Sequence, residues 1–316
     1  MHSLPNPTSI EAFHTWRTDT SQWLPVAIDI ARSHSVSCTN PHVFSMGTNL
    51  VVALNQQLIL KIFPPMLRHQ FDSERAALAR LHGRLSISVP QIVFKGERSG
   101  WPYLVMTRMS GVNGKEAWVS LPEDQRESVL SQVGEIIAEV QRVPLGDLSR
   151  LQPRWDQFIP RQIEGCRGRH ERLGMPQKYL DRLDDFLREA ATLIPVKAAP
   201  VILTGEYNPE NIFLEERSGR WRLAALIDFG DVMTGWGEYD LLGPSTFAAG
   251  GIPGRIRSLL RGFGRSEANL DPALPRRLMA LLLLHRFSNL TVQIRIEGWQ
   301  QKAADFYELE RLLWPI

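Results

Sequence analysis

The most informative part of this sequence reads VILTGEYNPENIFL at residues 201–214 and LAALIDFGD at residues 223–231. Each stretch contains a short apolar run, at 201–203 and at 223–227, that ends in a tight polar segment. The first polar segment contains Glu206 and, five positions later, Asn211. The second contains Asp228, followed directly by Phe229 and Gly230. Either half alone fits a β-hairpin with polar turn residues, but the two together at this spacing indicate a functional site.

These three polar residues match the needs of phosphoryl transfer. That reaction depends on positioning and charge neutralisation, with a carboxylate near the attacking hydroxyl and an Asn and an Asp that hold magnesium. Oxygen ligands suit Mg²⁺, which uses few protein groups and keeps several waters. The pattern therefore predicts Glu206 as the catalytic carboxylate and Asn211 and Asp228 as the metal ligands.

Composition limits the class of protein. The chain has 316 residues, 43% hydrophobic and 22% charged, with a net charge of +2, as expected for a globular protein with one large or two ordinary domains. The charge gives no argument for nucleic acid, and no basic amphipathic helix indicates a membrane partner. Only Cys38 and Cys166 are present, which fits a reducing cytoplasm. The first residues lack the basic and apolar regions typical of a signal peptide, so we expect none. We expect a cytoplasmic protein, and interpret Cys166 and His170 as an incidental pair.

The first third of the chain predicts an α+β unit. Helical periodicity covers 9–17 and 21–32, and short strands follow at 42–46, 50–54 and 58–63. A helix at 68–82 then precedes strands at 91–95 and 103–109. The segment 110–114 predicts a hinge. Beyond it helices dominate, at 121–143, 155–171, 176–193, 252–263, 275–293 and 298–313.

Lys61 is a charged residue inside the strongly apolar strand LILKIF at 58–63. A charge there is costly to bury without a partner, and Glu74 in the following helix is the candidate. Kinases use such a Lys–Glu pair to hold the ammonium against the nucleotide phosphates. The alternative is a lysine of an edge strand that extends to solvent. Ahead of it, Gly47 and Thr48 lie in a loop whose backbone amides could hold phosphates.

The motifs resemble those of the aminoglycoside phosphotransferases, relatives of the choline and protein kinases, whose pattern is His-Gly-Asp-x4-Asn followed by Ile-Asp-Trp or Ile-Asp-Phe. Three segments are similar in sequence to the hygromycin B kinases: WPYLVMTRMSG at 101–111, RVPL at 142–145 and LLWP at 312–315. The resemblance runs from about residue 40 to the end, and is loose in the helical part. It implies a two-lobed protein-kinase-like fold, with a nucleotide-binding lobe at 1–110 and a catalytic and substrate-binding lobe at 111–316.

The resemblance also implies a function and further site residues. Backbone groups of Thr107 and Met109 would bind the adenine edge, Lys61 with Glu74 would hold the phosphates of ATP or GTP, and Mg²⁺ would be required. The acceptor would be a hydroxyl of a small molecule, such as the aminoglycoside hygromycin B. Asp240 is expected to form structural hydrogen bonds at a helix start.

Two departures keep alternatives open. The family's His-Gly-Asp is replaced by Thr204-Gly205-Glu206, and Gln141 stands where the family commonly has His. A catalytically weak pseudokinase that binds nucleotide is therefore one alternative. The helices from residue 270 onward carry six basic against five acidic residues, with no acidic excess for a polycation. A kinase of a non-aminoglycoside metabolite is the other alternative.

Overall fold

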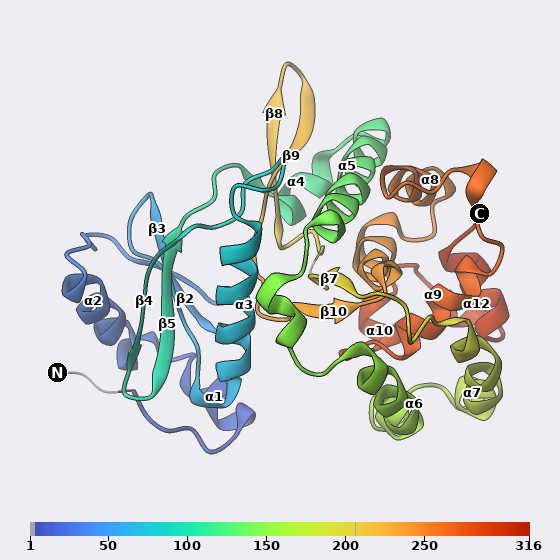
Figure 1. Cartoon of the computed structure of the whole chain (residues 1–316), viewed down its shortest axis with the longest axis horizontal. Coiled ribbons are helices and arrows are strands. Elements are labelled where there is room, and N and C mark those ends of the chain that lie inside the picture. Colours follow the sequence, from blue (N-terminus) through green and yellow to red (C-terminus); the bar gives the residue numbers. More distant parts are fainter. Residues whose placement is uncertain (1–3, 206) are drawn as a thin grey trace. The chain divides into compact units, whose positions relative to one another are not determined.

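The computed structural model describes residues 4–205 and 207–316, and the chain forms two compact units. The first unit contains the chain up to Arg84, then Ser88–Ser110 and Ile227–Val232. The second contains Leu85–Ile87, Gly111–Leu226 and Met233–Ile316. Figure 1 labels helices and strands of both units where there is room.

The first unit is built on a five-stranded antiparallel sheet. Its strands are β1 (His42–Phe44), β2 (Leu50–Ala53), β3 (Leu58–Ile62), β4 (Ile92–Arg98) and β5 (Trp101–Thr107). Their order in the sheet is β1-β2-β3-β5-β4, so β3 is the central strand. The prediction of three strands, a helix and two strands is confirmed. Because β3 is central, the interpretation of Lys61 as a residue of an edge strand is wrong.

The N-terminal segment packs on one face of this sheet. It forms α1 (Ile10–Trp16), capped by the side chain of Ser9, then the 3-10 turn η1 (Thr20–Gln22) and α2 (Leu24–Ser33). Phe13 and Trp23 from these helices share a buried cluster with Leu60 and Ile62 of β3. Successive side chains of a strand point to opposite faces. Lys61 therefore points to the other face, where α3 (Arg68–Leu81) lies, with the short turn η2 (Pro65–Leu67) before it.

The second unit is mainly helical. Its longer helices are α4 (Gly114–Ser120), α5 (Glu123–Arg142), α6 (Trp155–Arg172), α7 (Gln177–Ala190), α8 (Pro253–Gly262), α9 (Leu274–Leu283) and α12 (Phe306–Leu313). Shorter turns are η3 (Gly146–Arg150), η4 (Ala191–Leu193), η5 (Gly237–Leu241), the π-helical η6 (Pro244–Ala249), η7 (Glu267–Asn269), α10 (Leu290–Gln293) and α11 (Trp299–Lys302). No helix of the described residues combines the length and the apolar character needed to cross a membrane.

Two predicted helices are wrong in extent, because each is interrupted. The predicted helix at 275–293 divides into α9 and α10, and the one at 298–313 divides into α11 and α12. Asp305 begins α12 as its N-cap, with its carboxylate accepting the amide of Glu308 at 2.9 Å. An N-cap residue has a non-helical backbone, so Asp305 separates α12 from α11, although the apolar spacing continues across it.

Two small antiparallel sheets hold the predicted catalytic segment of the second unit. The strand β7 (Val201–Leu203) pairs with β10 (Met233–Gly235), and β8 (Ile212–Arg217) lies between β6 (Val112–Asn113) and β9 (Arg220–Leu226). Residues 204–211 therefore form the connection between β7 and β8, and Asp228 follows β9. Both apolar runs of the sequence end where the chain leaves a strand, as predicted.

Candidate functional site

Lys61 lies at the centre of a buried charge cluster in the first unit. Its Nζ is 2.6 Å from Oε2 of Glu74 and donates to Oδ1 of Asp228 at 2.9 Å. Lys61 and Glu74 are 5% and 1% exposed, so the predicted ion pair is present and buried. The Asp228 side chain stays 40% exposed. Strand β3 supplies the cation, helix α3 one carboxylate, and the segment after β9 the other.

The three groups shift one another's pKa. Burial raises the pKa of the Glu74 carboxyl to about 7, against the attraction of Lys61. Burial disfavours the Lys61 ammonium too, but Asp228 and Glu74 outweigh this effect and raise its pKa. Burial also opposes ionisation of Asp228, yet the Lys61 charge holds the pKa of that carboxyl below its usual range. Lys61 and Asp228 are therefore both charged at neutral pH, as a phosphate- and metal-binding pair requires.

The carboxylate of Asp228 has a geometry that fits a metal ion. Its Oδ1 accepts from Lys61 and, at 3.4 Å, from the amide of Gly230. Within the described residues, no hydrogen bond uses its Oδ2. The backbone of Asp228 has a positive φ of 64°, which is rare outside glycine and is found at sites where the surroundings fix a strained conformation. A partly exposed carboxylate that is fixed through one oxygen can offer the other oxygen to Mg²⁺.

The predicted phosphate loop is anchored by a residue that nothing in the sequence marks. Arg17, which follows α1, donates to the carbonyl of Gly47 and, at 3.2 Å, to the carbonyl of Ser45. The Trp23 indole in turn donates to the carbonyl of Arg17 at 2.9 Å. Gly47 has a positive φ of 89°, a conformation that glycine adopts at little cost. The N-terminal helices thus support this loop as well as covering the sheet.

The predicted hinge follows β5. The Thr107 amide donates to the carbonyl of Gln91 at 3.0 Å, and its hydroxyl accepts from the Gln91 amide at 2.9 Å. Thr107 is therefore fixed to the residue before β4. In the part of the chain that the structure describes, no hydrogen bond occupies the Met109 amide. This donor would be open to the adenine edge that the prediction assigns to it.

The predicted catalytic loop belongs to the second unit, and Glu206 itself lies outside the described residues. The loop before it is held by Asp240 of η5, whose carboxylate accepts the amides of Thr204 at 3.1 Å and Gly205 at 2.8 Å. Burial raises the pKa of the Asp240 carboxyl to about 7, although these amides act in the opposite direction. Gln141 donates to the carbonyl of Gly237 at 2.9 Å and so fixes the start of η5. Asp240 therefore forms structural hydrogen bonds, as expected, but it does so from within η5 (Gly237–Leu241) to the loop after β7, so its expected place at a helix start is wrong.

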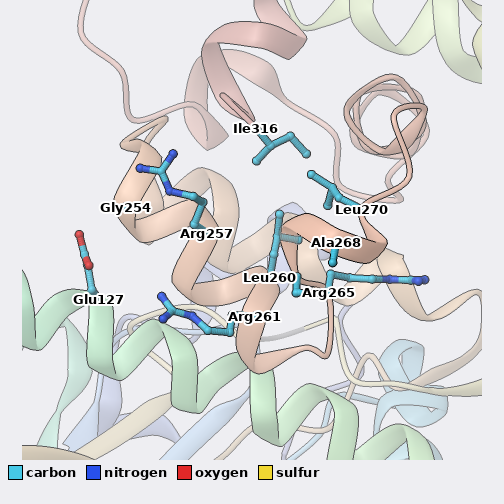
Figure 2. Close-up of a pocket in the computed structure, with 10 residues that line it drawn as sticks. Glu127, Gly254, Arg257, Leu260, Arg261, Arg265, Ala268, Leu270 and Ile316 are labelled. Atoms are coloured by element: carbon cyan, nitrogen blue, oxygen red, sulfur yellow. The ribbon is translucent and has the colours of Figure 1, made fainter.

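Two other features of the sequence and the surface involve none of these groups. Cys166 and His170 both contact the carbonyl of Leu283, at 3.5 and 3.1 Å, as expected for an incidental pair on α6. No three His, Cys, Asp or Glu side chains of the described residues cluster as a metal site. Figure 2 shows a hollow of about 820 Å³ in the second unit. None of the predicted site residues lines it; its lining is Glu127, Gly254, Arg257, Leu260, Arg261, Arg265, Ser266, Ala268, Leu270 and Ile316.

Comparison with known proteins identifies the family. Residues 47–281 match the model of the phosphotransferase enzyme family, APH, and the chain belongs to that family. Arg17 and the N-terminal helices precede the matched region.

The chain is also similar in fold to solved structures. These include the GDP complex of aminoglycoside 2'-phosphotransferase-IIIa, with a TM-score of 0.69 at 18% identity over 92% of this chain and 96% of that one. Macrolide 2'-phosphotransferase MphH from Brachybacterium faecium gives 0.56 at 15% identity over 92% and 98%. The complex of streptomycin, ATP and APH(2'')-IIa gives 0.55 at 14% identity over 85% and 92%. This similarity confirms the predicted protein-kinase-like α+β fold.

Proposed function

We propose that the protein transfers the terminal phosphoryl group of ATP or GTP to a hydroxyl of a small molecule. The observation that carries this proposal is the buried Lys61, which bridges Glu74 and Asp228. A buried ammonium between two carboxylates has no evident advantage for stability, because desolvation offsets most of the attraction. In a chain of the phosphotransferase family, the same arrangement is what nucleotide phosphates and a metal ion require.

Each residue has a role in this proposal. Lys61, fixed by Glu74, steadies the phosphates, and the amides at Gly47 and Thr48 bind their oxygens. Thr107 and Met109 bind the base. Asp228 and Asn211 supply oxygen ligands to Mg²⁺, which when bound neutralises phosphate charge. Glu206 accepts the proton of the acceptor hydroxyl while the oxygen of that hydroxyl forms its bond to the terminal phosphorus. The bond between this phosphorus and the oxygen that bridges it to the β-phosphate breaks, and ADP or GDP leaves.

The acceptor is best described by its charge. The acidic residues of the helices expected to form the acceptor site are largely neutralised by arginines. Arg277 contacts Glu238 at 2.5 Å and Asp271 at 2.9 Å, and Arg276 contacts Glu310 at 2.6 Å. A polycationic aminoglycoside such as hygromycin B requires unpaired acidic groups. We therefore infer that a neutral or weakly charged polyhydroxylated molecule is a better acceptor.

The test is nucleotide-dependent phosphorylation of a panel of acceptors. Purified protein is incubated with ATP or GTP and Mg²⁺, and the products are identified by mass spectrometry and ³¹P NMR. The panel contains hygromycin B, kanamycin, a macrolide and neutral polyols. We expect a phosphate monoester on a neutral or monocationic acceptor. Efficient transfer to hygromycin B would contradict the inference about charge but support the transferase.

A second candidate is a pseudokinase that binds nucleotide and catalyses weakly. Thr204 and Glu206 in place of the family's His and Asp favour it. A carboxylate displaced by about 1 Å can lower the rate on the order of a hundredfold. Tight nucleotide binding with no transfer to any acceptor would support this candidate over the transferase.

A further inference from the structure

Besides the Lys61 cluster, the first unit contains a series of polar side chains joined by hydrogen bonds, which we call the polar chain. The side-chain amide of Asn49 donates through Nδ2 to Oε1 of Gln70 at 3.0 Å. Gln70 donates through Nε2 to Oδ2 of Asp231 at 3.3 Å. Asn49 and Gln70 are 4% and 6% exposed. A buried amide that loses its partner has no water to replace it, so each of these hydrogen bonds is costly in free energy to break.

The Asp231 carboxylate, at one end of the polar chain, fixes the orientation of the two side-chain amides. An ionised carboxylate only accepts hydrogen bonds, so Gln70 must present its NH₂ group to Asp231. Its carbonyl oxygen then faces Asn49, which must present its own NH₂ group in return. Reversal of either amide would place two acceptors or two donors together.

Gln70 lies one helical turn before Glu74 on the same face of α3. Glu74 holds Asp228 through Lys61, and Gln70 contacts Asp231 directly. One face of α3 therefore holds the segment 228–231 at two points. Gly230 lies between them, where an added Cβ would approach the Cβ of Gln70 to 3.3 Å. Any larger residue at position 230 would press on Gln70.

The other end of the chain lies at the predicted phosphate loop. Asn49 directly follows Gly47 and Thr48 and precedes β2. We propose that Gln70 is a positioning residue that links the phosphate loop to the metal-holding segment, so that nucleotide and Mg²⁺ each strengthen the binding of the other. This inference rests on the proposed function. Coupling between two ligands is reciprocal and is measured as the ratio of nucleotide affinities with and without metal.

The first test replaces Gln70 by Met, which keeps the length of the side chain and removes both the carbonyl and the NH₂ of its amide. Isothermal calorimetry gives the Kd for ATP with Mg²⁺ and with EDTA. We expect the affinity ratio to fall about fivefold or more, within the usual range of such couplings. Arg75→Ala, at a partly exposed position on α3, serves as the control and should keep the wild-type ratio. A purely structural role would lower the melting temperature but leave the ratio unchanged.

The second test reverses the direction of the chain and does not depend on Gln70→Met folding. Asn49→Asp alone places a carboxylate on each side of Gln70. Gln70 has one NH₂ group to donate, so one hydrogen bond is lost in either orientation of its amide. Asp231→Asn alone weakens the hydrogen bond from Gln70 to residue 231, because the acceptor loses its charge. The double variant N49D/D231N restores an acceptor at one end and a donor at the other. We expect it to recover Mg²⁺-dependent nucleotide binding beyond the sum of the single effects, as interacting pairs do.

The outcomes separate the two proposals. A wild-type protein that binds no nucleotide overturns the proposed function and this inference together. A wild type that binds nucleotide in a Mg²⁺-dependent manner, with an unchanged ratio in Gln70→Met or strictly additive effects in the double variant, overturns only the positioning role of Gln70.

Discussion

Lys61 is the residue whose removal has the clearest expected effect. Lys61→Met leaves Glu74 buried beside a methyl group, and breaking a buried ion pair typically costs about 3–5 kcal/mol. The loss is smaller at pH 6 than at pH 8, because Glu74 can take up a proton when its partner is absent. Nucleotide binding should be abolished. Chemical denaturation at both pH values and calorimetry with ATP measure these effects.

Lys61→Arg is the matched control, since it keeps the charge. This variant should fold with a smaller loss of stability than Lys61→Met and regain part of the nucleotide affinity. Equal loss of stability in the two variants, or unchanged nucleotide binding in Lys61→Met, would contradict the assignment of Lys61 to the phosphates.

Asp240 gives a prediction for pH. Its folded-state pKa of about 7 lies above the ordinary value for Asp, so its contribution to stability is present at low pH and is lost as pH rises through 7. Asp240→Asn removes this titration. From pH 5 to pH 8, the free energy of unfolding of D240N should therefore rise relative to wild type, on the order of 2 kcal/mol. A constant difference across this range would contradict the raised pKa of the buried Asp240 carboxyl.

Glu206→Asp tests whether the departure from the family pattern is an adaptation. The substitution shortens the side chain by one methylene and restores the family's residue. If the site is adapted to glutamate, transfer to the acceptor should fall about a hundredfold, because the carboxylate retreats from the hydroxyl by about 1 Å. The measurement is the rate of product formation at saturating nucleotide. A gain in rate would instead indicate a decayed enzyme.

Helices α5 and α8 of the second unit pack closely enough to require glycine at their contact. A Cβ on Gly134 would lie 2.2 Å from the carbonyl oxygen of Leu259, and one on Gly262 would lie 1.9 Å from that of Ser131. Backbone atoms cannot yield as side chains do, so Gly134→Ala and Gly262→Ala should each destabilise the protein by about 1–3 kcal/mol.

Gly165 in α6 is the control, since no atom lies within 4 Å of its added Cβ. Gly165→Ala should stabilise the protein by about 0.5–1 kcal/mol, because alanine favours the helix. Urea unfolding of the three variants measures both signs. A stabilising effect of alanine at position 134 or 262 would contradict the close contact of α5 and α8.

Much of the first unit could be predicted from sequence, because strand and helix periods change clearly there and Lys61 is conspicuous in its apolar run. The helix breaks after Leu283 and Lys302 could not, since the apolar spacing continues across them. Gln70 and Arg17 were missed for another reason. Their partners, Asp231 and Gly47, lie far away in the sequence, and nothing local to either residue marks the contact.

The molecule as a whole combines a β-rich unit that carries Lys61, Glu74 and Asp228 with a helical unit that carries Asn211 and the loop containing Glu206. In the proposed function, the first unit contains the nucleotide-binding groups, and charge neutralisation by Mg²⁺ is a condition for tight binding. A ligand that binds only the folded state raises the melting temperature by an amount that grows with its affinity and concentration.

The most direct test is therefore the melting temperature of the wild-type protein with ATP or GTP, with Mg²⁺ and with EDTA. At a ligand concentration about a hundredfold above Kd, nucleotide should add about 2.7 kcal/mol of stability, a shift of several degrees, and most of it should require Mg²⁺. The Lys61→Met variant, measured in parallel, should show no shift. Equal melting temperatures of the wild type with and without every nucleotide would contradict the proposed phosphotransferase function.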